Sequence, residues 1–273
     1  MALRAMTFLS IQARRTIRAH FHFLKKRQVS TESAEQGKRW AAIKAIRHVI
    51  DSQPSVIGLG SGTTIVYAID ELKKHKIAQD VICIPTSFQT RQLILANNLK
   101  LGSLEQYPRI DVTVDGADEI DPRLNAIKGG GACLFQERLV AKASRRFVLV
   151  ADERKRSHQL GTKWRRGVPV EVVPMALSPI QYTLEEMFPD ALIRLRISQP
   201  SDKAGPVVTD NGNFILDCHF GPIQNPDLLY KEIKSLTGVL DVGLFYNMAD
   251  TAYIGHLESD SGDILSVSNL IKQ

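Results

Sequence analysis

The sequence has few cysteines, no long hydrophobic run and no acidic side chain over its first 31 residues. The three cysteines, Cys83, Cys133 and Cys218, are too few and too scattered for a disulfide framework or a zinc site. No apolar stretch approaches the roughly 18 residues that a membrane-spanning helix needs. These absences argue against a disulfide-rich secreted protein and against a membrane protein, and they predict a reducing compartment.

The absence of Asp and Glu from the first 31 residues determines how the net charge of +6 is interpreted. Residues 1–31 hold seven of the 35 Lys and Arg side chains, which leaves 28 against 29 Asp and Glu in the rest of the chain. The remaining chain is therefore near neutral and lacks the basic stripe expected of a nucleic-acid reader. We predict no nucleic-acid partner. The segment itself has the composition of an organelle-targeting presequence, and equally that of a disordered basic tail.

Helical and strand patterns alternate from residue 32 onward, which is typical of an α/β domain with a parallel sheet. Four parallel strands are expected at residues 56–59, 81–84, 110–114 and 147–151. Helical patterns lie between them, at residues 65–72, 88–97 and 132–145. After residue 164 the pattern indicates antiparallel strands at 170–173, 192–197, 207–209 and 214–218, with a turn at Asp210-Asn211-Gly212-Asn213. A helix at 225–236 and strands at 239–245 and 252–255 follow.

These patterns predict a Rossmann-like domain with a mostly parallel sheet and a second, smaller α+β (ferredoxin-like) domain. Residues 1–33 form the basic extension, residues 34–164 together with 246–273 form the α/β catalytic domain, and residues 165–245 form the small domain. The chain is thus expected to return to the first domain at its end.

A glycine-rich turn, Gly58 to Thr64, lies between a predicted strand and a predicted helix. Free backbone N–H groups and the helix dipole favour an anion there. The glycine spacing does not fit a dinucleotide fingerprint, and the turn lacks the lysine of a nucleotide-triphosphate loop. A small phosphate ester is the better ligand, although a turn that merely needs glycines remains an alternative.

The acidic sequence Asp115-Gly116-Ala117-Asp118-Glu119 follows another predicted strand. Ligands of open α/β sheets bind at the carboxyl ends of strands, so this position favours a functional site. Two alternatives stay open, namely a turn whose aspartates bond only local backbone and a Mg²⁺ site.

Three consecutive glycines in Lys128-Gly129-Gly130-Gly131 open the helix expected from about residue 132. Glycine runs cost backbone entropy, so a close approach to a ligand is expected, with the N–H groups and Lys128 available to an oxyanion. Helical spacing places Ala132, Phe135, Leu139 and Ala143 on the core face and Glu137 away from it. By periodicity alone, Glu137 is an ordinary surface glutamate.

Lys155 follows a further strand end and could bind a phosphate as a point charge. His158 is the histidine nearest to these loops in sequence, and it is interpreted as structural. Cys133 has no neighbouring base in sequence that would make it a nucleophile.

These motifs, in this order, resemble ribose-5-phosphate isomerase of the A type. The resemblance rests on Gly58 to Thr64, Asp115 to Ile120, Lys128 to Gly131 with Glu137, and Ala151 to Lys155. It continues through residues 169–175, 208–213 and 242–245, and covers about residues 35–256.

The resemblance implies an aldose-ketose isomerase that interconverts ribose 5-phosphate and ribulose 5-phosphate in the pentose phosphate pathway, with no cofactor and no metal. The implied phosphate site consists of Ser61, Gly62, Thr63, Thr64 and Lys155, and the implied sugar site of Asp115, Gly116, Ala117, Asp118, Lys128, Gly129, Gly130 and Gly131. Glu137 is the implied proton acceptor, with Asp115, Asp118 and Lys128 as further catalytic residues. Lys38 is the nearest match to a lysine that the family places in its first helix, and its role stays open.

Two other functions are weighed against this one. A sugar-phosphate sensor would need the phosphate turn but not the acids, and a deaminase of amino-sugar phosphates should need a histidine that cannot be placed here. The expected partner is a small phosphorylated pentose, and the family suggests a homodimer or homotetramer. We expect a cytoplasmic location, with a mitochondrion or another organelle as the alternative because of the basic N-terminus.

Overall fold

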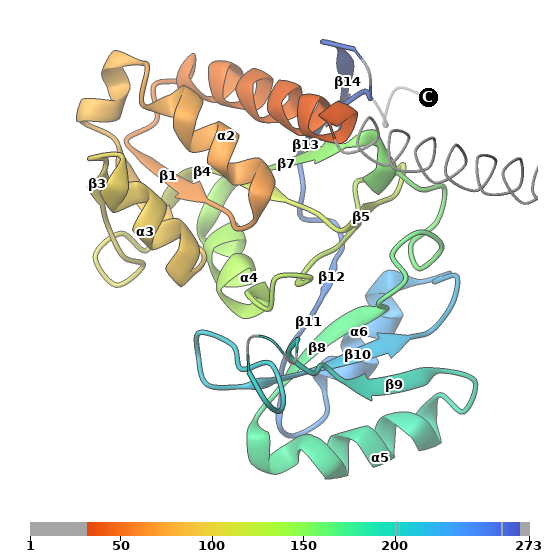
Figure 1. Ribbon diagram of the computed structural model, residues 1–273. Coiled ribbons are helices and arrows are strands. Elements are labelled where there is room, and N and C mark those ends of the chain that lie inside the picture. Colours follow the sequence, from red (N-terminus) through yellow and green to blue (C-terminus); the bar gives the residue numbers. More distant parts are fainter. Residues whose placement is uncertain (1–31, 200, 202, 258, 268–273) are drawn as a thin grey trace, which may run out of the picture.

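The structure is a computed structural model that describes residues 32–199, 201, 203–257 and 259–267. A large sheet and a smaller sheet each have their own layer of helices, and short strands connect them (Figure 1). Residues 1–31 of the predicted basic extension lie outside the described residues. The predicted division into domains at residue 164 stays a prediction.

The large sheet has seven strands in the order β14-β13-β7-β4-β1-β2-β3. All neighbours are parallel except β14, which pairs antiparallel with β13. The strands are β1 (Val56–Leu59), β2 (Ile82–Pro85), β3 (Lys100–Leu101), β4 (Ile110–Gly116), β7 (Ser144–Asp152), β13 (Thr251–Gly255) and β14 (Gly262–Ser266).

Six parallel strands therefore replace the four that were predicted. β3 has only two residues and leaves no readable pattern in the sequence, whereas β13 was expected as a strand but not assigned to a partner. Counted along the chain, the parallel strands run 3-2-1-4-5-6 across the sheet, which is the doubly wound order of a Rossmann-like fold. The order reverses between β1 and β4.

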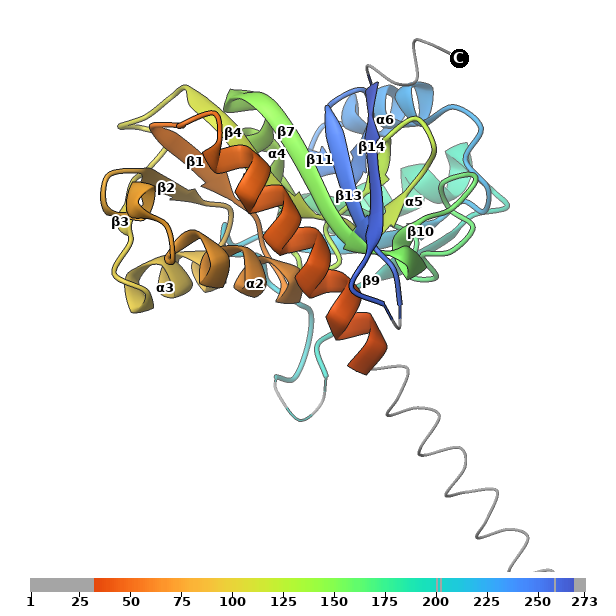
Figure 2. The same ribbon diagram turned by 90° about the horizontal axis from the view of Figure 1, so that it is seen from above.

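Helices cover both faces of this sheet. The helix over residues 32–50 packs on one face beside α2 (Thr63–Leu72) and α3 (Phe88–Ala96), where its alanines allow close approach to the strands (Figure 2). On the other face, Val140 of α4 (Leu134–Ala143) packs against residues of β1, β2 and β4. Burial on both faces explains why these strands are almost continuously apolar.

The smaller sheet has four antiparallel strands in the order β11-β8-β10-β9. Its elements follow one another as β8 (Val168–Val172), α5 (Leu177–Met187), β9 (Leu192–Leu195), β10 (Phe214–His219), α6 (Pro226–Lys234) and β11 (Val239–Val242). Both helices share one apolar core with the strands. This order and packing confirm the predicted ferredoxin-like α+β fold.

One prediction for this part of the chain is wrong, and one helix was missed. Residues 207–209 form no strand, because the Thr209 hydroxyl accepts hydrogen bonds from the N–H groups of Asn211 and Asn213 and holds the chain in a turn. The helix α5 was not predicted. Pro179 lies in its first turn, and a proline inside a helical pattern usually argues against a helix.

A third sheet joins the two halves of the fold. It consists of β5 (Glu119–Ile120), β6 (Ala126–Ile127) and β12 (Leu244–Phe245), in the order β12-β6-β5. Next to it, the N–H group of Lys128 donates to the carbonyl of Gly243. Among the described residues, no helix is both long and apolar enough to cross a bilayer.

Candidate active site

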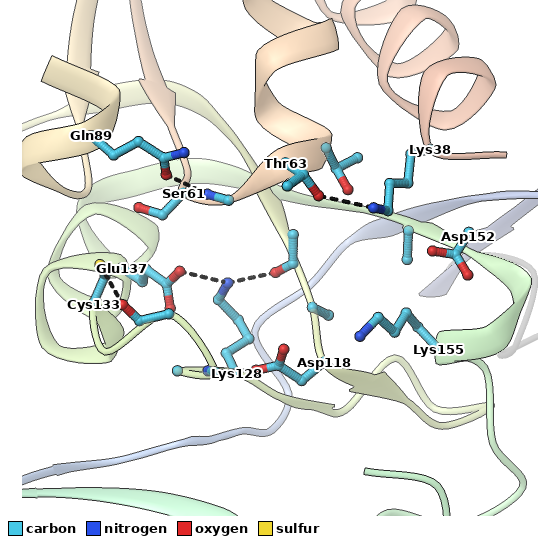
Figure 3. A pocket seen from close by; sticks show the side chains of 18 of the residues that line it. Lys38, Ser61, Thr63, Gln89, Asp118, Lys128, Cys133, Glu137, Asp152 and Lys155 are labelled. Carbon is cyan, nitrogen blue, oxygen red and sulfur yellow. Dashed lines mark hydrogen bonds and ion pairs between the residues drawn. The ribbon is translucent and has the colours of Figure 1, made fainter. Parts of the chain in front are cut away.

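The loops that follow β1, β4 and β7 meet at one edge of the parallel sheet and surround a pocket (Figure 3). β1 and β4 are the neighbours between which the strand order reverses, where open α/β sheets bind ligands. Almost all predicted site residues line this pocket, namely Ser61, Gly62, Thr63, Thr64, Gly116, Ala117, Asp118, Lys128, Gly129, Gly130, Gly131, Glu137 and Lys155. Asp115 is the exception.

The turn after β1 leads directly into α2. Gly60 lies so close to Asp115 that a Cβ atom on it would come within 1.8 Å of a carboxylate oxygen. Gly62, at a φ of 94°, precedes the first residue of α2 and supplies no side-chain cap. The Ser61 hydroxyl is 2.7 Å from that of Thr86. The first turn of α2 thus keeps its N–H groups at the pocket, where an anion is favoured.

Two lysines face the same end of the pocket (Figure 3). Lys38 donates from Nζ to the Thr63 hydroxyl at 3.0 Å and to a carboxylate oxygen of Glu35 at 2.6 Å. Lys155 follows β7, and its Nζ lies 4.9 Å from the ring centroid of Trp164. Two cations and an open helix terminus make this end suitable for a phosphate group.

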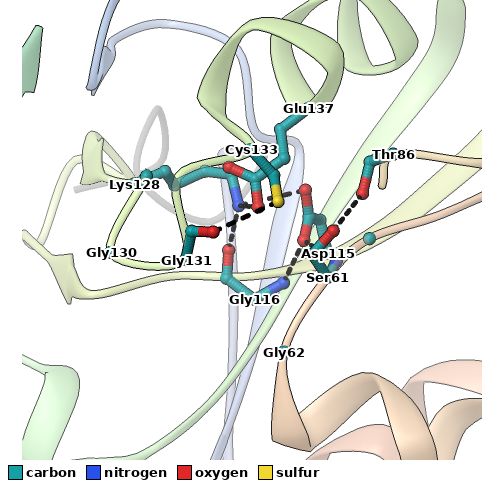
Figure 4. Close-up of polar contacts among 12 residues, drawn as sticks. Ser61, Gly62, Thr86, Asp115, Gly116, Lys128, Gly130, Gly131, Cys133 and Glu137 are labelled. Carbon is teal, nitrogen blue, oxygen red and sulfur yellow. Dashed lines mark hydrogen bonds and ion pairs between the residues drawn. The ribbon is translucent and has the colours of Figure 1, made fainter. Parts of the chain in front are cut away.

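Three charged side chains are buried together at the other end of the pocket. Nζ of Lys128 is 3.0 Å from Oδ2 of Asp115 and 3.3 Å from Oε1 of Glu137, and it also donates to the carbonyl of Gly116 (Figure 4). Lys128, Asp115 and Glu137 are 2%, 0% and 5% exposed. The Lys128 ammonium thus donates to one carbonyl and forms ion pairs with two buried carboxylates.

Burial raises the pKa of Glu137 to about 8, with the charge of Lys128 opposing the shift and those of Asp115 and Asp118 adding to it. Burial likewise raises the pKa of Asp115, against the lowering effect of Lys128. Burial alone would lower the pKa of Lys128, but Asp115 and Glu137 raise it, so the lysine stays cationic. A carboxyl that titrates near neutral pH beside a fixed cation is suited to accept and return a proton.

Within the described chain, Oε2 of Glu137 has no hydrogen-bond partner although it is buried. Its residue lines the pocket, and its other oxygen is held by Lys128. A buried carboxylate oxygen without a partner is costly unless a ligand supplies one. The free oxygen is therefore available to a bound molecule.

The acidic sequence after β4 divides into three different environments. Asp118 lines the pocket, and its carboxylate accepts from the N–H group of Gly130 at 2.7 Å. Asp115 does not line the pocket, and its Oδ1 accepts from the N–H groups of Ser61 and Gly116. Glu119 faces away and accepts from four consecutive backbone N–H groups, those of residues 161–164.

The glycine run places the start of α4 later than predicted. Gly129 and Ala132 have φ values of 99° and 60°, so the chain turns twice in the left-handed region before the helix begins at Leu134. The predicted core stripe is wrong at Leu139, whereas Ala132 is buried as expected. Leu139 is 43% exposed, and the buried face instead contains Leu134, Glu137, Arg138, Val140 and Ala141.

Several lining residues were not predicted. Gln89 of α3 accepts from the N–H group of Gly62 at 3.0 Å, and the buried carboxylate of Asp152 binds Arg154. Asp152 directly follows the strand predicted at residues 147–151, a position that could have singled it out, whereas nothing in the local sequence marks Gln89. Cys133 also lines the pocket, and burial raises the pKa of its thiol to about 12, which makes it a poor nucleophile.

No histidine of the described chain lines the pocket, and His158 is exposed. In the same residues, no three His, Cys, Asp or Glu side chains are grouped as a metal site would need. The histidine that a deaminase should use for ring opening is therefore still not found.

Comparison with known proteins identifies relatives over most of the chain. The family model for ribose 5-phosphate isomerase A (phosphoriboisomerase A) matches residues 82–259. A ribose-5-phosphate isomerase of Candida albicans is 50% identical over 228 residues, which cover 83% of this chain and 95% of the relative. One of Schizosaccharomyces pombe is 49% identical over 231 residues, which cover 84% of this chain and 83% of the relative.

Solved structures agree with the sequence matches. A D-ribose-5-phosphate isomerase in complex with phospho-erythronic acid superposes with a TM-score of 0.77 at 37% identity, over 85% of this chain and 99% of that one. Ribose 5-phosphate isomerase from Plasmodium falciparum gives 0.76 at 34% identity, over 84% and 97%. The resemblance that the motifs suggested is confirmed, and this chain belongs to the ribose 5-phosphate isomerase A family.

Proposed function

We propose that this protein interconverts ribose 5-phosphate and ribulose 5-phosphate by moving a proton between C1 and C2 of the open-chain sugar. The observation that carries the proposal is the buried Glu137, held by Lys128 on one oxygen and free on the other, in the wall of a pocket. The opposite end of that pocket has the features that a phosphate group requires. A phosphorylated sugar would therefore bind with its reactive carbons toward Glu137.

The phosphate end combines the first turn of α2 with Lys38 and Lys155. The backbone N–H groups of Thr63 and Thr64 in the first turn of α2 supply donors, and the two lysines supply charge. Lys38 thereby receives the role that the sequence left open. Because its Nζ already contacts the Thr63 hydroxyl, it can bind the phosphate without moving far.

Glu137 is the proposed base. Its carboxylate takes the proton from C2 of the aldose, the electron pair forms the C1–C2 double bond of an enediolate, and the same carboxyl returns the proton to C1. The hydroxyl proton on O2 is lost while O1 gains one, so the carbonyl moves from C1 to C2. A base with a pKa of about 8 can accept and release protons at neutral pH, an effect worth typically 10²- to 10⁴-fold.

Lys128 has a different role from the one that the sequence suggested. Its Nζ donates to the carbonyl of Gly116 and lies 3.0 and 3.3 Å from the carboxylates of Asp115 and Glu137, so we assign it to act through its charge, which stabilises both the Glu137 carboxylate and the enediolate. Asp115 holds Lys128 and does not line the pocket. Asp118 does line it, and we assign it to bind the sugar hydroxyls.

The direct test is conversion of ribose 5-phosphate by the purified protein in D₂O, followed by NMR. We expect ribulose 5-phosphate to form, with deuterium at C1 of part of the product, because the proton on Glu137 can exchange with solvent before it returns. Binding of ribose 5-phosphate without conversion would contradict the proposal and favour a sensor. Ribulose 5-phosphate with no deuterium under any condition would favour a hydride shift.

We also propose a cytoplasmic location and a homodimeric or homotetrameric state, as the sequence suggested. A fluorescent protein fused to the C-terminus, which leaves residues 1–31 free, distinguishes the compartments. Light scattering on the purified chain gives its mass, and a monomer at micromolar concentration would contradict the predicted assembly.

A further inference from the structure

The enediolate needs hydrogen-bond donors in addition to the charge of Lys128. Nζ of Lys128 already donates to the carbonyl of Gly116 and pairs with Asp115 and Glu137, so we look for further donors in the backbone of Gly129 to Gly131. A glycine run is flexible, and an effective oxyanion site has to be held in place before the reaction. The structure contains a side chain that can hold it.

Arg196 lies directly after β9 of the smaller sheet and is 7% exposed. Its Nη1 donates to the carbonyl oxygen of Gly129 at 2.9 Å and to that of Gly130 at 3.1 Å. One buried guanidinium therefore binds two consecutive carbonyls of the glycine segment.

Peptide geometry determines where the N–H groups next to these carbonyls point. In a planar trans peptide, the C=O of one residue and the N–H of the next point in opposite directions. With the Gly129 carbonyl turned to Arg196, the N–H of Gly130 points to the other side, where it donates to Asp118. By the same geometry, the Gly130 carbonyl turns the N–H of Gly131 toward the pocket, and a Cβ built on Gly131 meets no atom within 4 Å.

Asp217 of β10 holds the guanidinium of Arg196 in place. It accepts from Nε of Arg196 at 2.9 Å and, through its second oxygen, from Nη2. A bidentate pair of this kind sets the plane of the guanidinium, which lysine cannot reproduce. The smaller sheet thus reaches the active site through these two residues.

We propose that Arg196, locked by Asp217, is a positioning residue that holds the N–H group of Gly130 on Asp118 and orients the N–H group of Gly131 toward the sugar. The inference rests on the proposed isomerase activity. It predicts that the smaller sheet contributes to catalysis without contacting the substrate.

The experiment compares Arg196→Lys and Asp217→Asn with Arg194→Lys, an exposed arginine on the same strand as the matched control. We expect kcat to fall at least about 10-fold in the first two variants with KM changed less than about threefold, because the donors act on the transition state. Phospho-erythronic acid, whose carboxylate resembles the planar enediolate, should lose affinity in proportion to kcat/KM. The control should retain wild-type values.

Two results would overturn the inference. One is kcat within about twofold of wild type in both variants, and the other is a lower kcat with undiminished affinity for phospho-erythronic acid. If Arg196→Lys does not fold, Asp217→Asn alone decides. Wild-type protein is assayed first, because its inactivity would refute the proposed function itself, whereas fully active variants would refute only the role of Arg196.

Discussion

Glu137 sets the pH dependence that this account predicts. As a base it must be ionised, so kcat/KM should fall about tenfold per pH unit below its pKa of about 8. The phosphate of the substrate titrates near pH 6 and produces a separate, lower inflection. Measurement of kcat/KM from pH 5 to 9.5 checks this, and a profile that is flat down to pH 5 would contradict the assigned base.

Lys128 has a measurable effect on stability. In Lys128→Met, two buried carboxyls lose their cation, and removing one partner of a buried ion pair costs roughly 3–5 kcal/mol. Asp115 and Glu137 can escape this cost by protonation, so the loss should be larger at pH 8.5 than at pH 5. Urea denaturation at both pH values measures it, with Lys142→Met, an exposed lysine of α4, as the control. Equal losses at the two pH values would show that charge is not the cause.

The sequence identified the pocket residues but not their individual environments. Strand ends and glycines are local signals, and they located the phosphate turn, Asp118 and the Lys128 segment. The burial of Glu137 depends on the register of α4, which the left-handed Ala132 shifts. The engagement of Asp115 depends on contacts with Ser61 and Lys128, which are distant in sequence.

At the scale of elements, the loop at residues 161–164 depends on a single buried carboxylate. Glu119 of β5 accepts from four backbone N–H groups of this loop, and the loop carries Trp164 next to Lys155. Hydrogen bonds to a charged group contribute about 1.5–3 kcal/mol each when buried. The loop and the phosphate site are thus linked.

Glu119→Gln should therefore lower the free energy of unfolding by at least about 2 kcal/mol, because the NH₂ group of the amide would face backbone N–H groups that have lost their acceptor. Displacement of Trp164 should also raise KM more than it lowers kcat, since the proposed role of Lys155 is to bind the phosphate and not the reacting carbons. Thermal denaturation and steady-state kinetics check both effects. A variant with wild-type stability would contradict the role of Glu119, and Glu153→Gln, on the nearby turn, is the control.

Element prediction succeeded where periodicity was regular and failed where side chains override it. The strand over residues 56–59 and the helices α3 and α6 lie within one or two residues of the predicted ranges. The segment 207–209 has strand composition, but the bonds that Thr209 makes to Asn211 and Asn213 favour a turn. Arg196 could not be recognised, because its partners lie in another part of the fold.

At the scale of the whole molecule, two sheets supply different parts of one site. The parallel sheet provides the turn proposed to bind phosphate and the acids, and the antiparallel sheet reaches the glycine segment through Arg196. Neither the order of the strands nor this arrangement could be read from the sequence, since both depend on contacts between distant segments. β13, near the end of the described residues, pairs with β7 of the parallel sheet, whereas the predicted division into domains stays a prediction.

The proposed mechanism uses no metal ion. Activity should remain within about 20% of its initial value after dialysis against a chelator, because Glu137 and Lys128 supply the base and the charge. The assay is repeated after addition of Mg²⁺. Activity that disappears with the chelator and returns with Mg²⁺ would establish the metal alternative that the acidic sequence left open.

Glu137→Gln tests the central claim most directly. The amide keeps the shape of the side chain and cannot act as a base, so kcat should fall at least about 10²-fold. In the wild-type protein, Glu137 ionises as pH rises through the window from 4.5 to about 8, and because its pKa is raised this ionisation destabilises the folded state. Glu137→Gln removes that cost, so its melting temperature at pH 8.5 should not be lower than that of the wild type. Glu185→Gln, on the outer face of α5, is the matched control. An inactive, fully folded Glu137→Gln protein is the predicted result, and full activity in this variant would contradict the account.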